Sequence, residues 1–500
     1  MKSLKNLLVP FIIVIALVIC AIVYLIADYA GKNKIDESSS GMIEVVYYNL
    51  TDISSLSVYN RDTGITSNVK CSLNSDGTVH FDYVGDDSSS DEKYSQMSLY
   101  KYVEALSSFY SSSKVSGAGN FSDYGLDFPA FTITINGNNG INTTLYLGNK
   151  SPDGMNCYMY VAGTKDIYSV NVNKMVEAGQ SAINFLETMN LGIDYSELSK
   201  VHFDRKSDGL SIDANVEITQ SGIAVFDIFK PYSHPASSYF GILIDKIVGL
   251  EIAEYISVED SELFKYGLDD PDYHFVLTMN NGSKTELYFS REQNGYYYGF
   301  VKGIKKYFVL SELQLEGLNL SELVLIDPYI SYCYAKNITS ITGTYGSKQF
   351  RFELDVKDGQ SISSEDSSVV LDGRNARVFD SEGRSYSSIL FESLSCIKIG
   401  GIETGASVNT SAGPVISFSF NDKSYNSTVY DFYTRDDDSF YVFKDGTYTD
   451  FYVYSGELFN DGGLDTYSYG CWRAYELLSE AIFIVFSSGS LNNVSNVSGK

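Results

Sequence analysis

The spacing of hydrophobic and polar positions changes along this 500-residue chain. From Leu7 to Ala27 the residues are apolar without a single charge, and as a helix that run reaches roughly 30 Å, the thickness of a hydrocarbon core. Further on, alternating runs such as Phe131, Ile133 and Ile135 have the period of a half-buried strand. The pattern predicts one membrane-spanning helix followed by a mainly β-structured region.

The apolar run is expected to remain in the mature protein as a transmembrane helix at residues 7–27. Cleavage as a signal peptide is the alternative, but signal peptides have a shorter apolar core and small residues at the cleavage site, whereas Asp28 follows this run. Lys2 and Lys5 precede it. Residues 1–6 are therefore expected in the cytoplasm and the rest outside, as in a single-pass protein of the cell membrane.

A stretch of 24 residues occurs twice. Residues 124–147 and 266–289 share 11 identical residues in register, among them Tyr-Gly-Leu-Asp-x-Pro and a later Asn-Asn-Gly. Unrelated segments would share about one or two, so internal duplication explains the likeness. In each copy the Pro begins an alternating run and Asn-Gly then favours a tight hairpin turn.

Each copy is predicted to be an α+β unit in which one helix packs on an antiparallel sheet. The hairpin and the two aromatic strands that follow it predict a local sheet of about four strands. A helical apolar face precedes the motif in each copy. Its residues are Leu99, Val103, Leu106 and Tyr110 in the first copy and Leu243, Ile247 and Leu250 in the second.

A third, degenerate copy begins near Ile338 and has a helical pattern from Tyr386 to Ile397, but it lacks the motif. Before Pro414 the chain reads Asn-Thr-Ser-Ala-Gly instead. An amphipathic stretch follows near the end, and disorder is expected from about Ser487. The predicted organisation is a cytoplasmic end at 1–6, a transmembrane helix at 7–27, repeat units at 43–182, 183–324 and 325–460, and a partly disordered C-terminal segment at 461–500.

Composition narrows the possible partners. The net charge is −27 with only 36 Lys and Arg, which argues against nucleic acid, because phosphate binding needs clustered basic residues. Beyond the predicted helix, five cysteines follow at intervals that match no metal or redox spacing. Buried, inert thiols are expected, with at most one or two disulfides. These residues are Cys71, Cys157, Cys333, Cys396 and Cys471.

No set of residues with the spacing of a catalytic, cofactor or metal site is found. The four histidines, His80, His202, His234 and His274, are far apart in sequence, so zinc-ligand spacing is missing. Ser111 and Lys114 match a Ser-x-x-Lys pattern only by letter. The chain is therefore expected to be no enzyme and to need no cofactor; catalytic groups that converge from distant positions are the remaining alternative.

The repeated Tyr-Gly-Leu-Asp-x-Pro motif is interpreted as a structural turn. We expect Gly125 and Gly267 to adopt a backbone angle that other residues resist, the following leucines to enter the core, and Asp127 and Asp269 to satisfy nearby N–H groups. A ligand-facing loop is the alternative, because Tyr and Asp side chains bind polar groups.

The motif, its hairpin and the Tyr-rich strands after it resemble the bacterial domain-of-unknown-function family numbered 4340, over roughly residues 40–460. The resemblance implies single-span proteins with extracytoplasmic repeats that accompany ABC transport components of gliding-motility type. It carries no catalytic or binding residues. The expected function is a membrane-anchored scaffold or accessory protein of an ABC-type transport system, with an adhesive or envelope-polysaccharide-binding protein as the alternative; the small-molecule ligand, if any, stays unknown.

Overall fold

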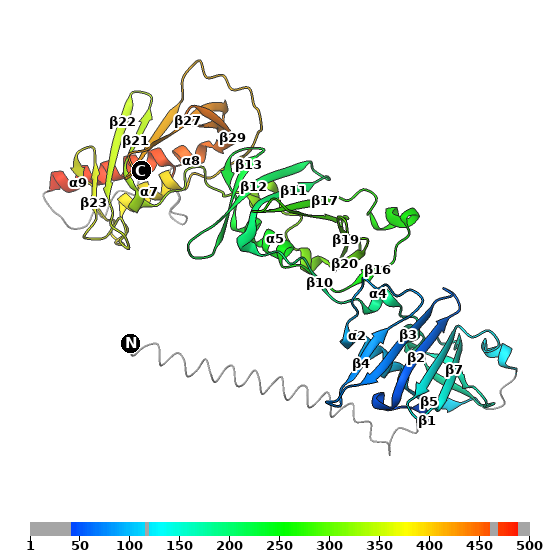
Figure 1. Cartoon of the computed structure of the whole chain (residues 1–500). Coiled ribbons are helices and arrows are strands. Elements are labelled where there is room, and N and C mark those ends of the chain that lie inside the picture. The colour runs from blue at the N-terminus through cyan, green and yellow to red at the C-terminus, as the bar shows by residue number, and fades with distance from the viewer. Residues whose placement is uncertain (1–41, 116–119, 461–468, 489–500) are drawn as a thin grey trace, which may run out of the picture. The chain divides into compact units, whose positions relative to one another are not determined.

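The computed structural model describes residues 42–115, 120–460 and 469–488, which form antiparallel sheets with few helices (Figure 1). The predicted α+β class is confirmed. The chain divides into two compact units, Met1–Thr188 and Met189–Lys500. The predicted cytoplasmic end and transmembrane helix, residues 1–27, lie outside the described residues. Within the described part of the chain, no helix is both long and apolar enough to cross a membrane.

The first unit is built on a nine-stranded sheet, here called sheet 1, with the order β1-β5-β9-β8-β7-β6-β2-β3-β4. Its helices are α2 (Gln96–Ser107), α3 (Asn173–Ala178) and α4 (Ala182–Phe185). Its strands are β1 (Ile43–Tyr47), β2 (Ile53–Asn60), β3 (Thr66–Leu73), β4 (Val79–Tyr83), β5 (Ser108–Lys114), β6 (Phe131–Gly137), β7 (Asn142–Lys150), β8 (Asn156–Val161) and β9 (Ile167–Asn171).

The second unit begins with sheet 2, nine strands in the order β14-β13-β12-β11-β17-β18-β19-β20-β16. Helices α5 (Ser238–Val248) and α6 (Glu322–Leu325) accompany it, and β10 (Met189–Asn190) pairs with β15 (Glu251–Ile252) beside it. The strands are β11 (Leu198–Arg205), β12 (Leu210–Ile218), β13 (Ala224–Lys230), β14 (His234–Pro235), β16 (Tyr255–Ile256), β17 (Tyr273–Met279), β18 (Lys284–Phe289), β19 (Tyr296–Val301) and β20 (Tyr307–Ser311).

Sheet 3 completes the second unit with the order β24-β23-β22-β21-β26-β27-β28-β29-β25. Its helices are α7 (Tyr386–Ser395), α8 (Ser455–Phe459) and α9 (Cys471–Ser488). The strands are β21 (Ile338–Tyr345), β22 (Lys348–Asp355), β23 (Ser368–Leu371), β24 (Arg374–Asn375), β25 (Gly401–Ile402), β26 (Ile416–Asp422), β27 (Ser427–Asp436), β28 (Ser439–Lys444) and β29 (Thr447–Tyr454).

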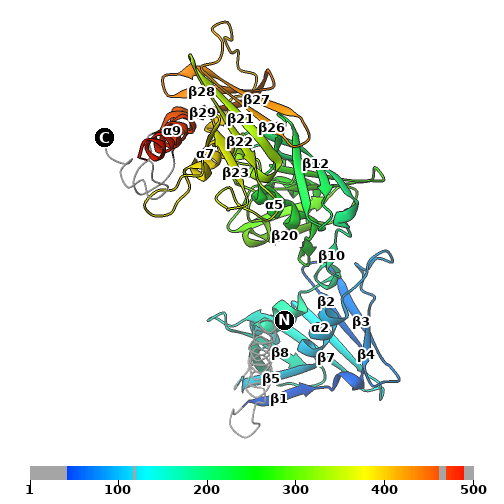
Figure 2. The same cartoon turned by 90° about the vertical axis from the view of Figure 1, so that its left-hand side faces the viewer.

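Eight strands of each sheet share one order, and the ninth strand differs: it is β1, beside β5, in sheet 1, but β14, beside β13, in sheet 2 and β24, beside β23, in sheet 3. Figures 1 and 2 show the sheets from two directions. In each sheet, a three-strand meander leads to a helix, and the first strand of that meander pairs antiparallel with the first strand of a later meander: β2 with β6, β11 with β17, and β21 with β26. The strand after the helix pairs with the last strand, as β5 with β9, β16 with β20 and β25 with β29. This topology is consistent with repeated units and includes the copy that lacks the motif.

A β-bulge at the start of each central strand pair is also shared. It interrupts the register after Ile53 in β2, after Leu198 in β11 and after Ile338 in β21. A bulge leaves ladder groups unpaired, and here a hydroxyl of the bulged residue donates to a carbonyl of the partner strand. The bonds run from Ser54 to Asn136 at 2.9 Å, from Ser199 to Thr278 at 3.0 Å and from Thr339 to Asn421 at 3.0 Å.

The helix after each meander begins at a serine N-cap whose side chain accepts a hydrogen bond from the first turn. The caps are Ser95, Ser237 and Ser385. Helix α2 buries Leu99, Val103 and Leu106, and the helices of the second unit likewise contribute to its core. Along the central strands buried residues alternate with half-buried ones, so each sheet has one packed face and one open face.

The two units have separate cores. One cluster of buried residues lies in the first unit, and another runs continuously through sheets 2 and 3 of the second. At the junction of these two sheets the rings of Tyr232 and His234 lie 4.8 and 4.9 Å from that of Phe451. Helix α9 packs on sheet 3, where Tyr475 stacks on Phe350 at 4.5 Å.

Two expectations differ from the structure. Each sheet has nine strands rather than about four, because the meander before the helix joins the hairpins after it. Tyr110 lies in β5 rather than on the helix, which ends at Ser107; from Ser108 onward the burial alternates with the period of a strand. The disorder predicted from about Ser487 stays a prediction, because α9 ends at Ser488 and residues 489–500 lie outside the described residues.

Candidate functional site

The repeated Tyr-Gly-Leu-Asp turn is built alike in both copies. Gly125 and Gly267 are left-handed, with φ of 68° and 64°, which favours glycine. Leu126 and the matching Leu268 are 3% and 4% exposed, so both enter the core as expected. The preceding tyrosines each contact a Tyr of the next hairpin edge to face, at 4.7 and 4.8 Å. These contacts are those of a structural turn.

The aspartates of this turn do not match the expectation. Asp127 and Asp269 are exposed, and within the described residues neither carboxylate accepts a hydrogen bond from a nearby N–H. The turn is therefore held by its glycine, its leucine and its tyrosine contact, and its acidic position is available to solvent.

The Ser-x-x-Lys pattern does not form a catalytic pair. Ser111 is buried in β5, and its hydroxyl donates to the backbone carbonyls of Ser113 at 2.7 Å and Ser169 at 2.8 Å. Lys114 instead pairs with Asp166 at 2.6 Å. The two residues have the spacing of the motif but not the contacts of a catalytic serine and its lysine base.

Two of the four histidines also have local, separate roles. His80 lies on β4 in the first unit and contacts Asp82 at 3.2 Å, with 47% of its side chain exposed. His234 is buried, and its Nε2 lies 2.9 Å from the carbonyl of Asp327. Burial lowers the pKa of His234 below its usual value. Neither is part of a ligand cluster.

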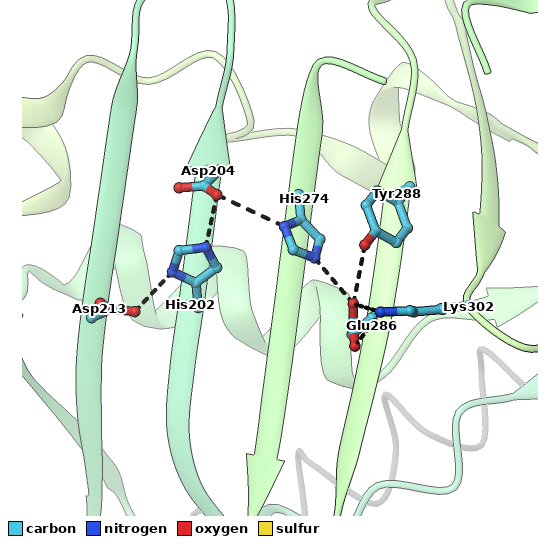
Figure 3. Close-up of polar contacts among 7 residues, drawn as sticks. All are labelled: His202, Asp204, Asp213, His274, Glu286, Tyr288 and Lys302. Atoms are coloured by element: carbon cyan, nitrogen blue, oxygen red, sulfur yellow. Dashed lines mark hydrogen bonds and ion pairs between the residues drawn. The ribbon is translucent and has the colours of Figure 1, made fainter. Parts of the chain in front are cut away.

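The other two histidines are brought together by strand register. His202 and Asp204 are two residues apart on β11, so both point to the same face. The adjacent strand β17 runs antiparallel and places His274 directly opposite Asp204. Figure 3 shows the three side chains on the open face of sheet 2, with Asp204 between the two imidazoles.

The carboxylate of Asp204 is the common contact of both imidazoles. Its Oδ2 lies 2.7 Å from Nε2 of His202 and 3.8 Å from Nδ1 of His274. The three potential ligand atoms all lie within 4.8 Å of one another, and all three residues are half-buried. The two ring centroids are 5.6 Å apart. Two imidazoles and one carboxylate at such distances form a set of groups able to hold a metal ion.

A second carboxylate approaches each histidine from the side away from Asp204. Asp213, opposite His202 on β12, lies 2.7 Å from its Nδ1. Glu286 on β18 lies 3.6 Å from Nε2 of His274. Each imidazole therefore has one nitrogen beside an outer carboxylate and the other beside Asp204 (Figure 3).

The outer carboxylates are themselves held. Lys302 donates to both oxygens of Glu286 at 2.8 and 2.9 Å, and the Tyr288 hydroxyl donates to the same group at 3.0 Å. The bond to Lys302 is the main reason why the pKa of Glu286 is lowered. Lys230 lies 3.5 Å from Asp213. Tyr288 also stacks on the ring of His274 at 4.4 Å, which limits the rotation of that imidazole.

Both histidines and the two outer carboxylates, Asp213 and Glu286, line a hollow of about 420 Å³ on this face, whereas Asp204 is not among its lining residues. Burial lowers the pKa of His274, and the nearby His202 adds to this effect, which favours the neutral imidazole that binds metals. Besides members of the cluster, Lys200 and Lys284 line the hollow. The hollow gives a small ligand or water access to the histidines.

The fold itself does not require this cluster. The shared bulge aligns the sheets, so the positions of His202, Asp204, Asp213, His274 and Glu286 can be compared in all three. In sheet 1 these positions hold Ser57, Tyr59, Asn68, Thr132 and Thr144. In sheet 3 they hold Thr342, Thr344, Arg351, Ser417 and Val429. The same topology thus forms without histidine or carboxylate at any of the five positions.

Sequence reasoning missed this cluster because its histidines are separated by a full meander, a helix and a turn. His202 and His274 are 72 positions apart, and no short spacing links them. One signal was present: His202 and Asp204 alternate on a predicted strand, and His274 lies on the strand that begins after the repeated motif. The sequence does not show that these two strands pair, so it does not show that the two histidines lie together.

The chain is thus an α+β protein of antiparallel sheets that share one topology. Residues 88–221 match the family model described as "Domain of unknown function (DUF4340)". The resemblance inferred from the Tyr-Gly-Leu-Asp motif is confirmed over this segment. The match begins before α2 and ends after β12, so it covers parts of both compact units. No curated protein and no solved structure matches the chain.

Proposed function

We propose that this chain is a non-enzymatic accessory protein of a membrane transport complex, held at the cell membrane by residues 7–27, with its sheets outside the cytoplasm. The supporting observation is the architecture: three sheets of one topology, each with one packed face and one open face. Such a series of open faces suits a scaffold, because each face is available to a different partner region.

The class of partner comes from the family resemblance, which implies components of an ABC-type transport system. The residues of the Ser-x-x-Lys pattern have local structural contacts, so this pattern gives no reason to propose a serine hydrolase. A protein without chemistry of its own would act in such a complex by holding subunits or substrate-binding parts in place.

Affinity purification from native membranes in mild detergent tests the partnership. The full-length chain is expected to co-purify with the ATPase and permease subunits of an ABC transporter. A variant lacking residues 2–27 is the matched control and is expected to lose them if membrane attachment brings the partners together. Purification of the full-length chain with no transporter subunit attached would contradict the proposal.

Protease protection tests the orientation independently of any partner. With a tag at the N-terminus, protease added to intact spheroplasts is expected to remove residues 42–500 and to leave a small tagged fragment in the membrane. Full protection of the sheets, or recovery of the chain in the soluble fraction, would contradict the proposed localisation.

Binding of envelope polysaccharide is a second candidate function, supported by aromatic rows on open faces. In sheet 1, Tyr160 stacks on Tyr146 at 4.6 Å and contacts Phe121 at 4.6 Å. In sheet 2, Tyr288 stacks on Phe300 at 4.9 Å. Half-exposed aromatic rings are suitable platforms for sugar rings.

Sedimentation with purified cell-wall polysaccharide tests this candidate. Tyr160→Ala is expected to reduce binding several-fold. Tyr425→Ala is the matched control, since Tyr425 is 98% exposed and lies outside any aromatic row. Equal binding by the wild type and by Tyr160→Ala would exclude the row on sheet 1 as a sugar platform.

A further inference from the structure

We propose that sheet 2 binds a divalent transition-metal ion, for which Zn²⁺ is the probe, through Nε2 of His202, Nδ1 of His274 and a carboxylate oxygen of Asp204. These three atoms already lie within 4.8 Å of one another on adjacent strands. The site is separate from the scaffold role proposed above and does not depend on it.

A carboxylate beside the outer nitrogen of each histidine supports metal binding, although only Asp213, at His202, lies within hydrogen-bond distance. A histidine that binds a metal almost always donates its other ring N–H to a carboxylate or a carbonyl, which orients the ring and selects the tautomer. Here Asp213 lies 2.7 Å from Nδ1 of His202, and Glu286 lies 3.6 Å from Nε2 of His274. With an ion bound, a proton on each of these outer nitrogens would leave the lone pairs of both inner nitrogens for the ion; without an ion, the 2.7 Å contact between His202 Nε2 and Asp204 is a hydrogen bond.

The distances fit an ion after small side-chain movements. Ligand atoms at about 2.0–2.1 Å from a tetrahedral zinc ion are roughly 3.4 Å from each other. The separations from Asp204 Oδ2, at 2.7 Å to His202 and 3.8 Å to His274, lie on either side of that value. Three protein ligands leave a position for water or an external ligand, and the adjoining hollow of about 420 Å³ has room for it.

The charges around the proposed site are mixed. Asp204, Asp213 and Glu286 face the imidazoles, while Lys302 and Lys230 neutralise the two outer carboxylates. Asp204 is thus the carboxylate left for a cation. Lys200 and Lys284 also line the hollow, so an external ligand that completes the coordination would be anionic or neutral.

The comparison with the other sheets separates this proposal from a purely structural ion-pair network. A network needed to hold β11, β12, β17 and β18 together would be expected wherever these strands recur. Sheets 1 and 3 place hydroxyl, amide, aromatic, aliphatic or arginine side chains at the same positions. The cluster is therefore a feature of sheet 2 added to a fold that forms without it.

Metal binding can be measured directly on the full-length chain in detergent. After treatment with a chelator, competition with a chromophoric chelator is expected to show one equivalent of tightly held Zn²⁺ per chain. Co²⁺ is expected to give the visible absorption bands of a site with nitrogen and oxygen ligands. Zn²⁺ is also expected to raise the urea midpoint of the second unit.

The repeat supplies variants that the fold tolerates. His274→Thr and His202→Ser introduce the residues of sheet 1 at these positions, Thr132 and Ser57, and each is expected to weaken Zn²⁺ binding at least 100-fold. Asp213→Asn removes only an outer carboxylate and is expected to weaken it about 10- to 100-fold with unchanged stoichiometry.

The matched control is His80→Ser. His80 lies beside the carboxylate of Asp82 on β4, the edge strand of sheet 1 in the other unit. The variant is expected to leave Zn²⁺ binding unchanged. The proposal is overturned if the wild type binds no more Zn²⁺ than His274→Thr does, or if His80→Ser weakens binding as much as His274→Thr. Should His274→Thr unfold the chain, the comparison of Asp213→Asn with the wild type decides in the same way.

Discussion

The buried leucine of the Tyr-Gly-Leu-Asp turn provides the sharpest test of the two-unit description. Leu126 is 3% exposed and packs over Gly148 in β7, where an added Cβ would lie 2.9 Å from its Cδ2. Truncation of a buried leucine to alanine costs about 2–5 kcal/mol. For Leu126→Ala we expect about 3 kcal/mol, since the cavity lies at a turn that can partly collapse, and this corresponds to roughly a 150-fold change in the unfolding equilibrium.

Hydrogen exchange with peptide-level mass spectrometry can assign this loss to one unit, because core amides exchange through global opening. In Leu126→Ala, peptides from the strands of sheet 1 are expected to exchange roughly 150-fold faster, while peptides from sheets 2 and 3 keep their rates. Leu268→Ala is the reciprocal variant, with the effect confined to the second unit.

Phe128→Ala is the control for this experiment. Phe128 lies two residues after Leu126 in the same turn but is 78% exposed, so a change within about 0.5 kcal/mol is expected. The reasoning would be refuted if Leu126→Ala behaved like Phe128→Ala. Equal acceleration in both units would refute their description as separate cooperative units.

Three further predictions concern a helix cap, a histidine and two thiols. Ser237→Ala removes the N-cap of α5 and is expected to lower the stability of the second unit by about 1 kcal/mol in urea unfolding. Burial lowers the pKa of His234, so below about pH 6.5 the unfolded chain binds more protons at this residue than the folded chain does. The second unit should therefore lose stability as the pH falls from about 7.5 to 5, and the His234→Gln variant should lose less stability over the same range. Burial raises the pKa of the Cys71 and Cys157 thiols to about 12, so at pH 8 almost all of each thiol stays protonated. Both should resist iodoacetamide in native protein while reacting in urea.

Much of the architecture could be predicted from local patterns. The alternation of Phe131, Ile133 and Ile135 predicted a strand, and the structure has β6 from Phe131 to Gly137. Strands β19 and β20 begin where their aromatic runs begin. The sequence also indicated a third copy without the motif, because its strands and helix kept the same apolar periods. Such features depend on neighbours close in sequence, and periodicity detects them.

The joining of the meanders could not be predicted in this way. Pairing of β11 with β17 depends on two strands separated by a helix and a loop, and alternation alone does not say which strands are adjacent. The histidine cluster depends on that same pairing, since Asp204 meets His274 only across it. For the five cysteines outside residues 1–41 we expect buried thiols with at most one or two disulfides; in the structure all five are free, and Cys157 and Cys471 are buried.

The pairing at the centre of each sheet also governs the order in which a unit can be completed. Phe203 pairs with Phe275, 72 positions later, and Thr342 pairs with Ser419, 77 positions later. Closing so long a loop costs chain entropy before any contact across it is gained. During synthesis, the first strand of each first meander therefore has unpaired backbone N–H and C=O groups until the residues after the helix have been made. That interval is when the polypeptide is most prone to aggregate and most in need of a chaperone.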